Sequence, residues 1–340
     1  VNLHIDVEMS EDLQVEAGAV DLRGDWGRLH GRATFTAGFS TFDARVEIAE
    51  LEAWRLAGLT PQMDRLRSFR HPLEGEIEVA WEGGALRSGR FRLAGAEGAH
   101  DWGGISGQLR FEAGSPGPIG QTLAGEVGIR GLKPWMLAGV TGLEPLEGVR
   151  LPVSARARFE IDEGEVQALR LEVESGAGEV ALGEIYPEPL DVRRLELEAS
   201  ANDGLDVVHL DRLALDLGDV QPRVVAQIAR QDGRYAVRAT ATLEEMAVDR
   251  LKHYWPPTKA LRTNQWIAAH VPAGTARDVV FDVALDVDPE GEPRVQNLVM
   301  SGSMAYDGLV LDVLAPKPPA EGISGTATFE NGTLAFDVRR

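Results

Sequence analysis

The strongest constraint on the fold of this chain is a regular alternation of apolar and polar residues along most of its length. In the segment 153–162, every second residue is apolar, and Ser, Arg, Glu and Asp occupy the positions between them. The same alternation recurs in the segments 168–175, 194–200 and 279–287. Successive side chains of a strand point to opposite faces of a sheet, so the pattern predicts antiparallel strands with one apolar face and one solvated face.

Turn residues between the alternating segments predict hairpins. The Asn-Gly pair at 331–332 is a strong hairpin signal, and it would place Phe329 opposite Leu334 and Ala327 opposite Phe336. Further turn pairs stand at 83–84, 163–164 and 232–233.

Helical pattern is confined to three places, at about 60–69, 134–140 and 248–270. Thr60 is a suitable N-cap for the first helix and Pro61 a suitable first helical residue, with Met63, Leu66 and Phe69 on one side.

The third helical stretch predicts a helix–Pro–helix corner that closes one end of a sheet, with helices at about 249–254 and 259–270. The second of these helices would present Leu261, Trp266 and Ile267 inward. The residues predicted to build this structural corner are Tyr254, Trp255, Pro256 and Trp266.

Internal repetition suggests how the chain is organised. The tetrapeptide Gly-Ile-Ser-Gly occurs at 104–107 and at 322–325, followed by Phe-Glu at the same offset. A looser unit, in which a strand runs into a Trp-bearing helix, recurs three times. We therefore expect a β segment at 1–45 that continues from an earlier part, and repeat units at 46–130, 131–245 and 246–340.

Composition excludes several classes of protein. The formal net charge of −20 argues against binding nucleic acid or an anionic membrane surface through charge, and the absence of Cys excludes disulfides and thiolate chemistry. No apolar run approaches the ~18 residues of a membrane span. The chain begins in strand-like alternation without a start Met, so we expect it to be a piece of a longer protein.

Candidate catalytic motifs are weak. Ser106 and Ser324 lie in the repeated Gly-Ile-Ser-Gly, which is not the Gly-x-Ser-x-Gly frame of a hydrolase, and we interpret both as turn residues. The Gly-rich segment 176–181 lacks the following helix that a dinucleotide site requires, and we interpret it as a turn between strands.

Candidate metal motifs are weak as well. The segment 286–297 resembles a calcium-binding loop, but Asn297 replaces the bidentate Glu, which favours a hairpin tip. His253 and His270 are not accompanied by a carboxylate or a third His at metal-ligand spacing. We therefore assign no catalytic, cofactor-binding or metal-binding residue, and we expect no cofactor.

Roughly twenty alternating segments are too many for one flat sheet, because open sheets beyond about ten strands usually curl or split. Two architectures remain open: two sheets that close on each other, or one long twisted antiparallel sheet that curls into a groove, with short helices at its rim. Small inward residues favour the groove.

Ordered features in three segments resemble the AsmA-like family, in particular the central region of its large YhdP-type members. The segments are 131–180, 251–285 and 302–338, and the resemblance covers about residues 45–340. The most specific matches are Tyr254, Trp255, Pro256, Arg262, Trp266 and Gly274.

The resemblance implies a non-enzymatic periplasmic protein of a Gram-negative bacterium, anchored in the inner membrane. Such a protein carries phospholipids between the inner and outer membranes along a hydrophobic groove, and its partners are acyl chains, the two membranes and envelope proteins that bind by strand addition. The residues predicted to line the groove are Val153, Ala155, Ala157, Phe159, Ile161, Leu169, Leu171, Val173, Leu195, Leu197, Phe281, Val283, Leu285, Phe329, Leu334 and Phe336. Alternatives are a non-catalytic structural or assembly module of the cell envelope and, more distantly, a β-rich enzyme or carbohydrate-binding protein.

Overall fold

The structure is a computed structural model, and the described residues are 2–9, 15–36, 40–57, 63–67, 69–83, 85–95, 102–112, 122–138, 143–162, 165–181, 188–202, 204–231, 233–254, 261–288, 294–313, 317–330 and 333–339. Strands account for 75% of the described residues, and this part of the chain is mainly β with a large antiparallel sheet and a few short helices. The chain divides into two compact units. Unit 1 comprises residues 1–175 and 202–205, and unit 2 comprises residues 176–201 and 206–340.

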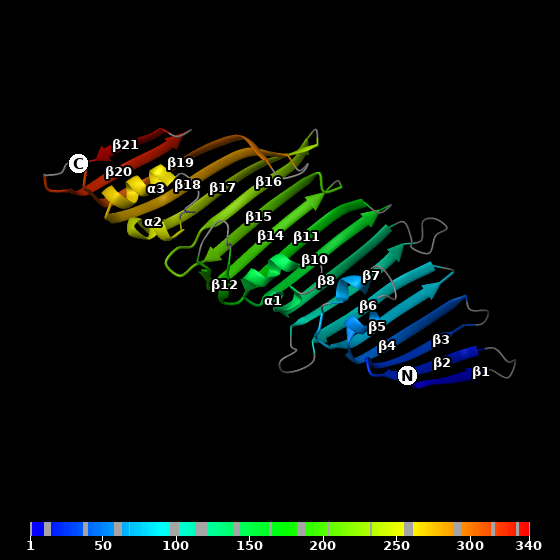
Figure 1. Cartoon of the computed structure of the whole chain (residues 1–340). Helices are drawn as coiled ribbons and strands as arrows, with labels where there is room; N and C mark the ends of the chain where they lie inside the picture. The colour runs from blue at the N-terminus through cyan, green and yellow to red at the C-terminus, as the bar shows by residue number, and fades with distance from the viewer. Residues whose placement is uncertain are drawn as a thin grey trace. The chain divides into compact units, whose positions relative to one another are not determined.

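Unit 1 is an antiparallel meander in which successive strands pair with each other (Figure 1). The strands are β1 (Asn2–Met9), β2 (Val15–Gly24), β3 (Gly27–Phe35), β4 (Thr41–Leu51), β5 (Leu73–Glu82), β6 (Ala85–Gly95), β7 (Gly104–Glu112), β8 (Thr122–Leu132), β9 (Val149–Arg150), β10 (Val153–Asp162) and β11 (Glu165–Ser175). The succession skips β9, because β10 pairs with β8 on one side and with β11 on the other.

Short helices in unit 1 follow β4 and β8. They are η2 (Ala53–Leu56), η3 (Met63–Leu66), α1 (Pro134–Leu137) and η5 (Glu144–Gly148). Pro134 begins α1, where its missing N–H costs no helical hydrogen bond. The two predicted helices are present but shorter than expected, and the predicted cap at Thr60 and Pro61 lies outside the described residues.

Unit 2 is a second antiparallel meander, from β15 to β21. Its strands are β12 (Gly178–Val180), β13 (Leu190–Val192), β14 (Arg194–Asn202), β15 (Val207–Asp216), β16 (Arg223–Gln231), β17 (Arg234–Ala247), β18 (Ala273–Asp288), β19 (Arg294–Leu311), β20 (Ala320–Glu330) and β21 (Thr333–Arg339). The helices α2 (Val248–Tyr254) and α3 (Leu261–His270) connect β17 to β18, where the sequence predicts them.

The predicted hairpins are confirmed by the strand register. Phe329 pairs with Leu334, and Ala327 pairs with Phe336. The other three hairpins close at Glu82–Ala85, Asp162–Glu165 and Gln231–Arg234.

Buried side chains gather where helices meet the ends of strands. In unit 1, Phe69, Trp102 and Leu132 form a cluster to which Met136 and Leu137 of α1 add. In unit 2, Val271, Tyr306, Leu309 and Ala327 form a cluster against which Ile267 of α3 packs. The helices therefore cover one end of each sheet face, and the described strand residues beyond them are mostly half-buried or exposed.

Candidate functional site

The candidate site is the apolar face of each sheet, which the strand register makes continuous. Residues paired across antiparallel strands share a face, so a chain of pairs defines a row across the sheet. The central row of unit 1 runs from β1 to β11 through Ile5, Val20, Gly31, Val46, Ile77, Phe91, Gly107, Val127, Ala157 and Leu171. One flanking row consists of Leu3, Leu22, Leu29, Ile48, Gly75, Leu93, Ile105, Ile129, Ala155 and Val173.

The other flanking row of unit 1 has the same composition: Val7, Gly18, Ala33, Ala44, Val79, Gly89, Leu109, Gly125, Phe159 and Leu169. None of these three rows contains a charged or hydrogen-bonding side chain. Unit 1 therefore presents one chemically uniform surface across its whole meander.

Unit 2 builds an apolar face by the same means. One row passes through Leu210, Ala226, Ala239, Val283 and Met300. The next consists of Val224, Ala241, Phe281, Gly302 and Phe329, and the rings of Phe281 and Phe329 stack with their centroids 6.2 Å apart.

Glycines on these faces lie under aromatic rings, a feature that the sequence patterns did not reveal. A Cβ added to Gly107 would stand 2.5 Å from the Phe91 ring, and one added to Gly125 would stand 2.7 Å from the Phe159 ring. In unit 2, Gly302 and Gly325 lie in the same way beneath Phe281 and Tyr306. Glycine inside a strand pattern is the sequence signal for such a close approach.

The predicted lining residues of unit 1 are half-buried and lie on one face. Ala155 pairs with Val173, Ala157 with Leu171, and Phe159 with Leu169. Along β10 the residues between them, from Ser154 to Glu160, are exposed. All of the predicted lining residues in this unit are half-buried: Val153, Ala155, Ala157, Phe159, Ile161, Leu169, Leu171 and Val173.

The predicted lining residues of unit 2 have a less uniform environment. Leu195, Leu197, Phe281, Val283, Leu285 and Phe329 are half-buried. Phe336, on the last strand, is 48% exposed, and Leu334 is placed only by its pairing with Phe329.

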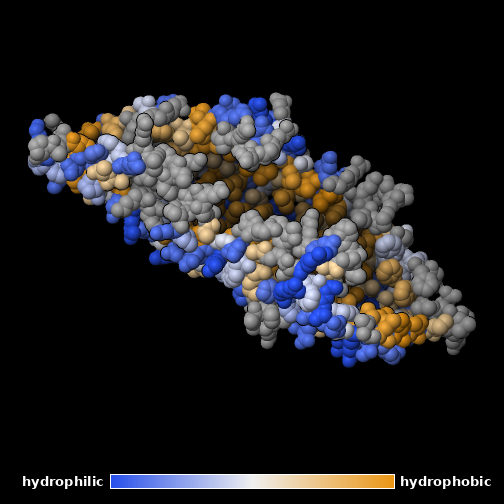
Figure 2. Space-filling view, viewed as in Figure 1, coloured by the Kyte–Doolittle hydropathy of each residue, from blue (hydrophilic) through white to orange (hydrophobic). Residues whose placement is uncertain are grey.

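Within each unit, the described residues form no second layer over most of the apolar face. Figure 2 shows hydrophobic residues over the strands of unit 1, most plainly along β1. The chain exposes 21563 Å², whereas a compact monomer of 36.8 kDa would expose about 13,600 Å². Taken apart, the two units would expose at least this area, whereas two compact proteins of half that mass would expose only about 16,000 Å².

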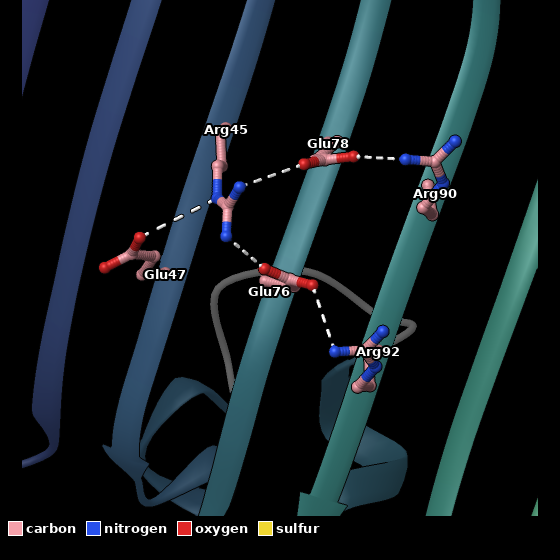
Figure 3. Close-up of polar contacts among 6 residues, drawn as sticks. All are labelled: Arg45, Glu47, Glu76, Glu78, Arg90 and Arg92. Atoms are coloured by element: carbon pink, nitrogen blue, oxygen red, sulfur yellow. Dashed lines mark hydrogen bonds and ion pairs between the residues drawn. The ribbon is translucent and has the colours of Figure 1, made fainter.

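The opposite face of unit 1 carries a network of ion pairs (Figure 3). Arg45 on β4 lies 2.5 Å from Glu76 and 3.3 Å from Glu78 on β5, and these carboxylates in turn contact Arg92 and Arg90 on β6. Farther along the sheet, a hydrogen bond from Arg158 lowers the pKa of Glu126. A shallow hollow of about 580 Å³ on this face is lined by matched Arg and Glu side chains, so its charge is balanced.

The predicted structural corner is only partly as expected. Tyr254 at the end of α2 is half-buried and donates a hydrogen bond to Asp219, which also pairs with Arg250 at 3.0 Å. Burial and this hydrogen bond raise the pKa of Tyr254 to about 12. Ile267 packs inward as predicted, but Trp266 is 42% exposed, so its predicted inward position is wrong.

Trp266 lies beside the ring of His270, with 5.3 Å between the ring centroids. A helix of this length packs against the sheet through a single stripe of apolar residues. Ile267 lies in this stripe, and Val271, directly after the helix, belongs to the same cluster. Trp255 and Pro256 lie outside the described residues, as does the side chain of Leu261.

The remaining sequence motifs, which were considered as catalytic or metal sites, lie in strands and turns. Ser106 lies within β7 and Ser324 within β20, so the interpretation of both as turn residues is wrong; Ser324 donates a hydrogen bond to Asp307 at 2.6 Å. The Gly-rich segment at 176–181 includes the turn before β12, and the 286–297 segment spans the hairpin between β18 and β19.

Within the described ranges, no group of three or more His, Cys, Asp or Glu side chains could hold a metal ion. No helix in the described part of the chain has the length and apolar character needed to cross a membrane.

The fold and the site define a class of protein: mainly β, with large antiparallel sheets that each expose one uncharged apolar face. Comparisons with known proteins found no match to this chain among family models, curated proteins or solved structures.

Proposed function

We propose that this chain binds phospholipid acyl chains along the apolar faces of its sheets. In this proposal it is a segment of an AsmA-like periplasmic protein, anchored in the inner membrane of a Gram-negative bacterium. The parent protein carries phospholipids between the inner and outer membranes, and the sheet curls around the lipid to form a groove with the short helices at its rim.

The observation that carries the proposal is the set of uncharged rows on unit 1, which continue from β1 to β11 with no second layer of described residues of this unit above them. Large exposed apolar surfaces are rare on soluble proteins and normally serve an interaction. A long flexible hydrocarbon chain matches a surface that is uniform in chemistry and extended in one direction.

Physical chemistry supports acyl chains as the ligand. Each methylene removed from water contributes ~0.8 kcal/mol, so a phospholipid with two long chains gains substantially from contact with this face. A chain that slides from one row to the next exchanges one apolar contact for another, so movement along the face needs no cofactor. Head groups would remain in water at the margin, since the rows contain no charge to bind them.

The proposal is tested by site-specific photo-crosslinking in bacterial cells. A photoreactive phenylalanine analogue at position 157, on the apolar face of β10, should crosslink to phospholipid. The same analogue at position 158, the neighbouring residue on the charged face, is the matched control and should not crosslink. Equal crosslinking at both positions, or none at either, would contradict lipid binding on this face.

A second candidate function is a structural or assembly module of the cell envelope. The exposed strands β1 and β21 favour it, because strand edges bind partner strands through backbone hydrogen bonds. This alternative predicts protein crosslinks from β1 or β21 and no lipid crosslink from position 157.

A further inference from the structure

Arg70 of unit 1 is held against an aromatic ring at the helix-bearing end of the sheet. Its guanidinium carbon lies 4.2 Å from the centroid of the Trp54 ring in η2. Arg70 is exposed to water, and within the described residues it forms no ion pair. A guanidinium that lies over an aromatic face keeps the N–H groups at its edge available for an anion.

The neighbouring arginines differ from Arg70 because carboxylates neutralise them. Arg55 lies over the same ring, at 4.6 Å, but it donates hydrogen bonds to Glu52 and, at 2.7 Å, to Asp25. Arg67 pairs at 2.9 Å with the aspartate of η3. Of these three arginines, Arg70 is therefore the one that can offer a charged, two-pronged donor to a further ligand.

Arg70 also lies at the margin of the apolar face. Phe69, its direct neighbour in the chain, is buried in a cluster with Trp102. Ile105 and Ile129 pack against this cluster, and both belong to the flanking row of the apolar face that begins on β1. The apolar face therefore continues into the cluster beside which the charged side chain stands.

A phospholipid has the chemistry that this margin would recognise. Two oxygens of its phosphate can accept parallel N–H bonds from one guanidinium, which is the geometry that makes Arg the usual partner of phosphate. Its acyl chains can at the same time cover the apolar side chains of the adjoining row, such as Ile105 and Ile129. An uncharged lipid would leave the Arg70 donors to water.

We propose that Arg70, held against Trp54, binds the phosphate of a phospholipid whose acyl chains lie on the apolar face of unit 1. This inference rests on the proposed binding of acyl chains to that face, and it adds a fixed position for one head group. The net charge of −20 otherwise repels anionic lipids. The contact with Arg70 therefore selects a phospholipid over an uncharged lipid with the same chains.

Competition between two lipids that differ only in the phosphate tests the proposal. The full chain is incubated in detergent with equal amounts of phosphatidate and diacylglycerol that carry the same acyl chains, and native mass spectrometry measures the ratio of the two bound lipids. Arg70→Gln removes the guanidinium. Arg32→Gln is the matched control, since Arg32 is exposed, lies opposite Arg45 on the charged face and forms no ion pair within the described residues. Thermal melting verifies that the variants are folded.

The expected result is a preference for phosphatidate that depends on Arg70 alone. The unmodified chain and the Arg32→Gln control should bind phosphatidate about tenfold better than diacylglycerol, because a hydrogen bond to a charged group is stronger than one between neutral groups. Arg70→Gln should lose this preference and bind diacylglycerol as well as before. Inorganic phosphate at the same concentration should not displace phosphatidate, since it has no acyl chains to contact the apolar face.

Other results would overturn the proposal in distinguishable ways. Equal binding of both lipids by the unmodified chain would remove the phosphate site and leave acyl-chain binding intact, whereas binding of neither lipid would contradict the proposed function as well. A preference that survives Arg70→Gln, or that Arg32→Gln lowers equally, would show that Arg70 is not the phosphate partner. Displacement by inorganic phosphate would identify a site for the free anion instead of a lipid.

Discussion

Individual glycines on the apolar face leave room for the aromatic rings of neighbouring strands. The ring of Phe159 lies across Gly125, and the ring of Phe91 lies across Gly107, because neither glycine has a Cβ to lift the ring. Aromatic rings that cover a cross-strand glycine also protect its backbone from water. In both places a glycine and an aromatic residue are therefore direct neighbours in the same row.

Replacement of Gly125 by Ala should therefore destabilise the protein, by about 1–3 kcal/mol, because the added methyl group would press on Phe159 and Leu109. Gly128→Ala is the control on the same strand: its Cβ would meet only Ser106, at 3.6 Å, on the opposite face. Urea unfolding of both variants measures the difference. Equal unfolding free energies would mean that the ring contact has no energetic role.

Tyr254 makes a pH-dependent contribution to stability. Its pKa, raised by burial and by the hydrogen bond to Asp219, is about 12 in the folded protein, against 10.0 for an ordinary Tyr. A raised pKa means that the contribution is fully present below pH 10 and is lost as the pH rises through about 12.

The change Tyr254→Phe should abolish this part of the pH dependence. Thermal melting of the parent should decline more steeply than that of the variant between pH 10 and 12. Parallel declines would show that Tyr254 ionises equally easily in the folded and unfolded states. Below pH 10 the variant should be less stable by a constant amount, since it lacks the hydrogen bond.

At the scale of strands and helices, the alternation of apolar and polar residues predicts most of the fold. The reason is that the two-residue period of a strand determines which face of the sheet each side chain occupies. It correctly groups Ala157 with Leu171 and Phe281 with Val283. It cannot predict bulges, such as the irregularity after Glu160 in β10 or the one between Arg277 and Val280 in β18, because an extra residue leaves no regular signal.

Helices are predicted less well than strands in this chain. The position of α3 follows from the spacing of its apolar residues, but the exposure of Trp266 does not. Apolar character alone does not determine which residue of a short helix faces the sheet. Likewise Ser106 belongs to β7 although a glycine follows it directly, because pairing with Arg92 and Gly128 maintains the strand. The predicted repeat boundaries stay a prediction.

The charged face should contribute little to either stability or lipid binding. Glu172 contacts Arg170 at 3.6 Å, and Glu196 contacts Arg212 at 2.6 Å; in both pairs more than half of the Arg side chain is exposed to water. Changing Glu160, Glu172 and Glu196 together to Gln should cost at most ~1 kcal/mol per exposed pair and leave lipid binding unchanged. Lipid extraction and thermal melting check this. Loss of lipid from a variant that still melts normally would place head groups or a partner on the charged face.

At the scale of the whole molecule, the central feature is that the protein exposes far more surface to water than a compact protein of the same mass. The area of 21563 Å² exceeds what two compact halves would expose, and in unit 1 the apolar rows run uninterrupted across the meander. A net charge of −20 makes copies of such a chain repel one another. The proposed acyl-chain ligand would cover the apolar rows over which the described residues of unit 1 place no second protein layer.

Mass spectrometry of the intact protein under native conditions tests this account most directly. The protein purified from Gram-negative cells should carry phospholipid that is released on unfolding, and Ala157→Glu, which introduces a charge into the central apolar row, should reduce the bound fraction. Arg158→Glu, on the charged face of the same strand, should retain it. A protein that is free of lipid in all three forms, although correctly folded, would contradict the claim that the apolar faces bind acyl chains.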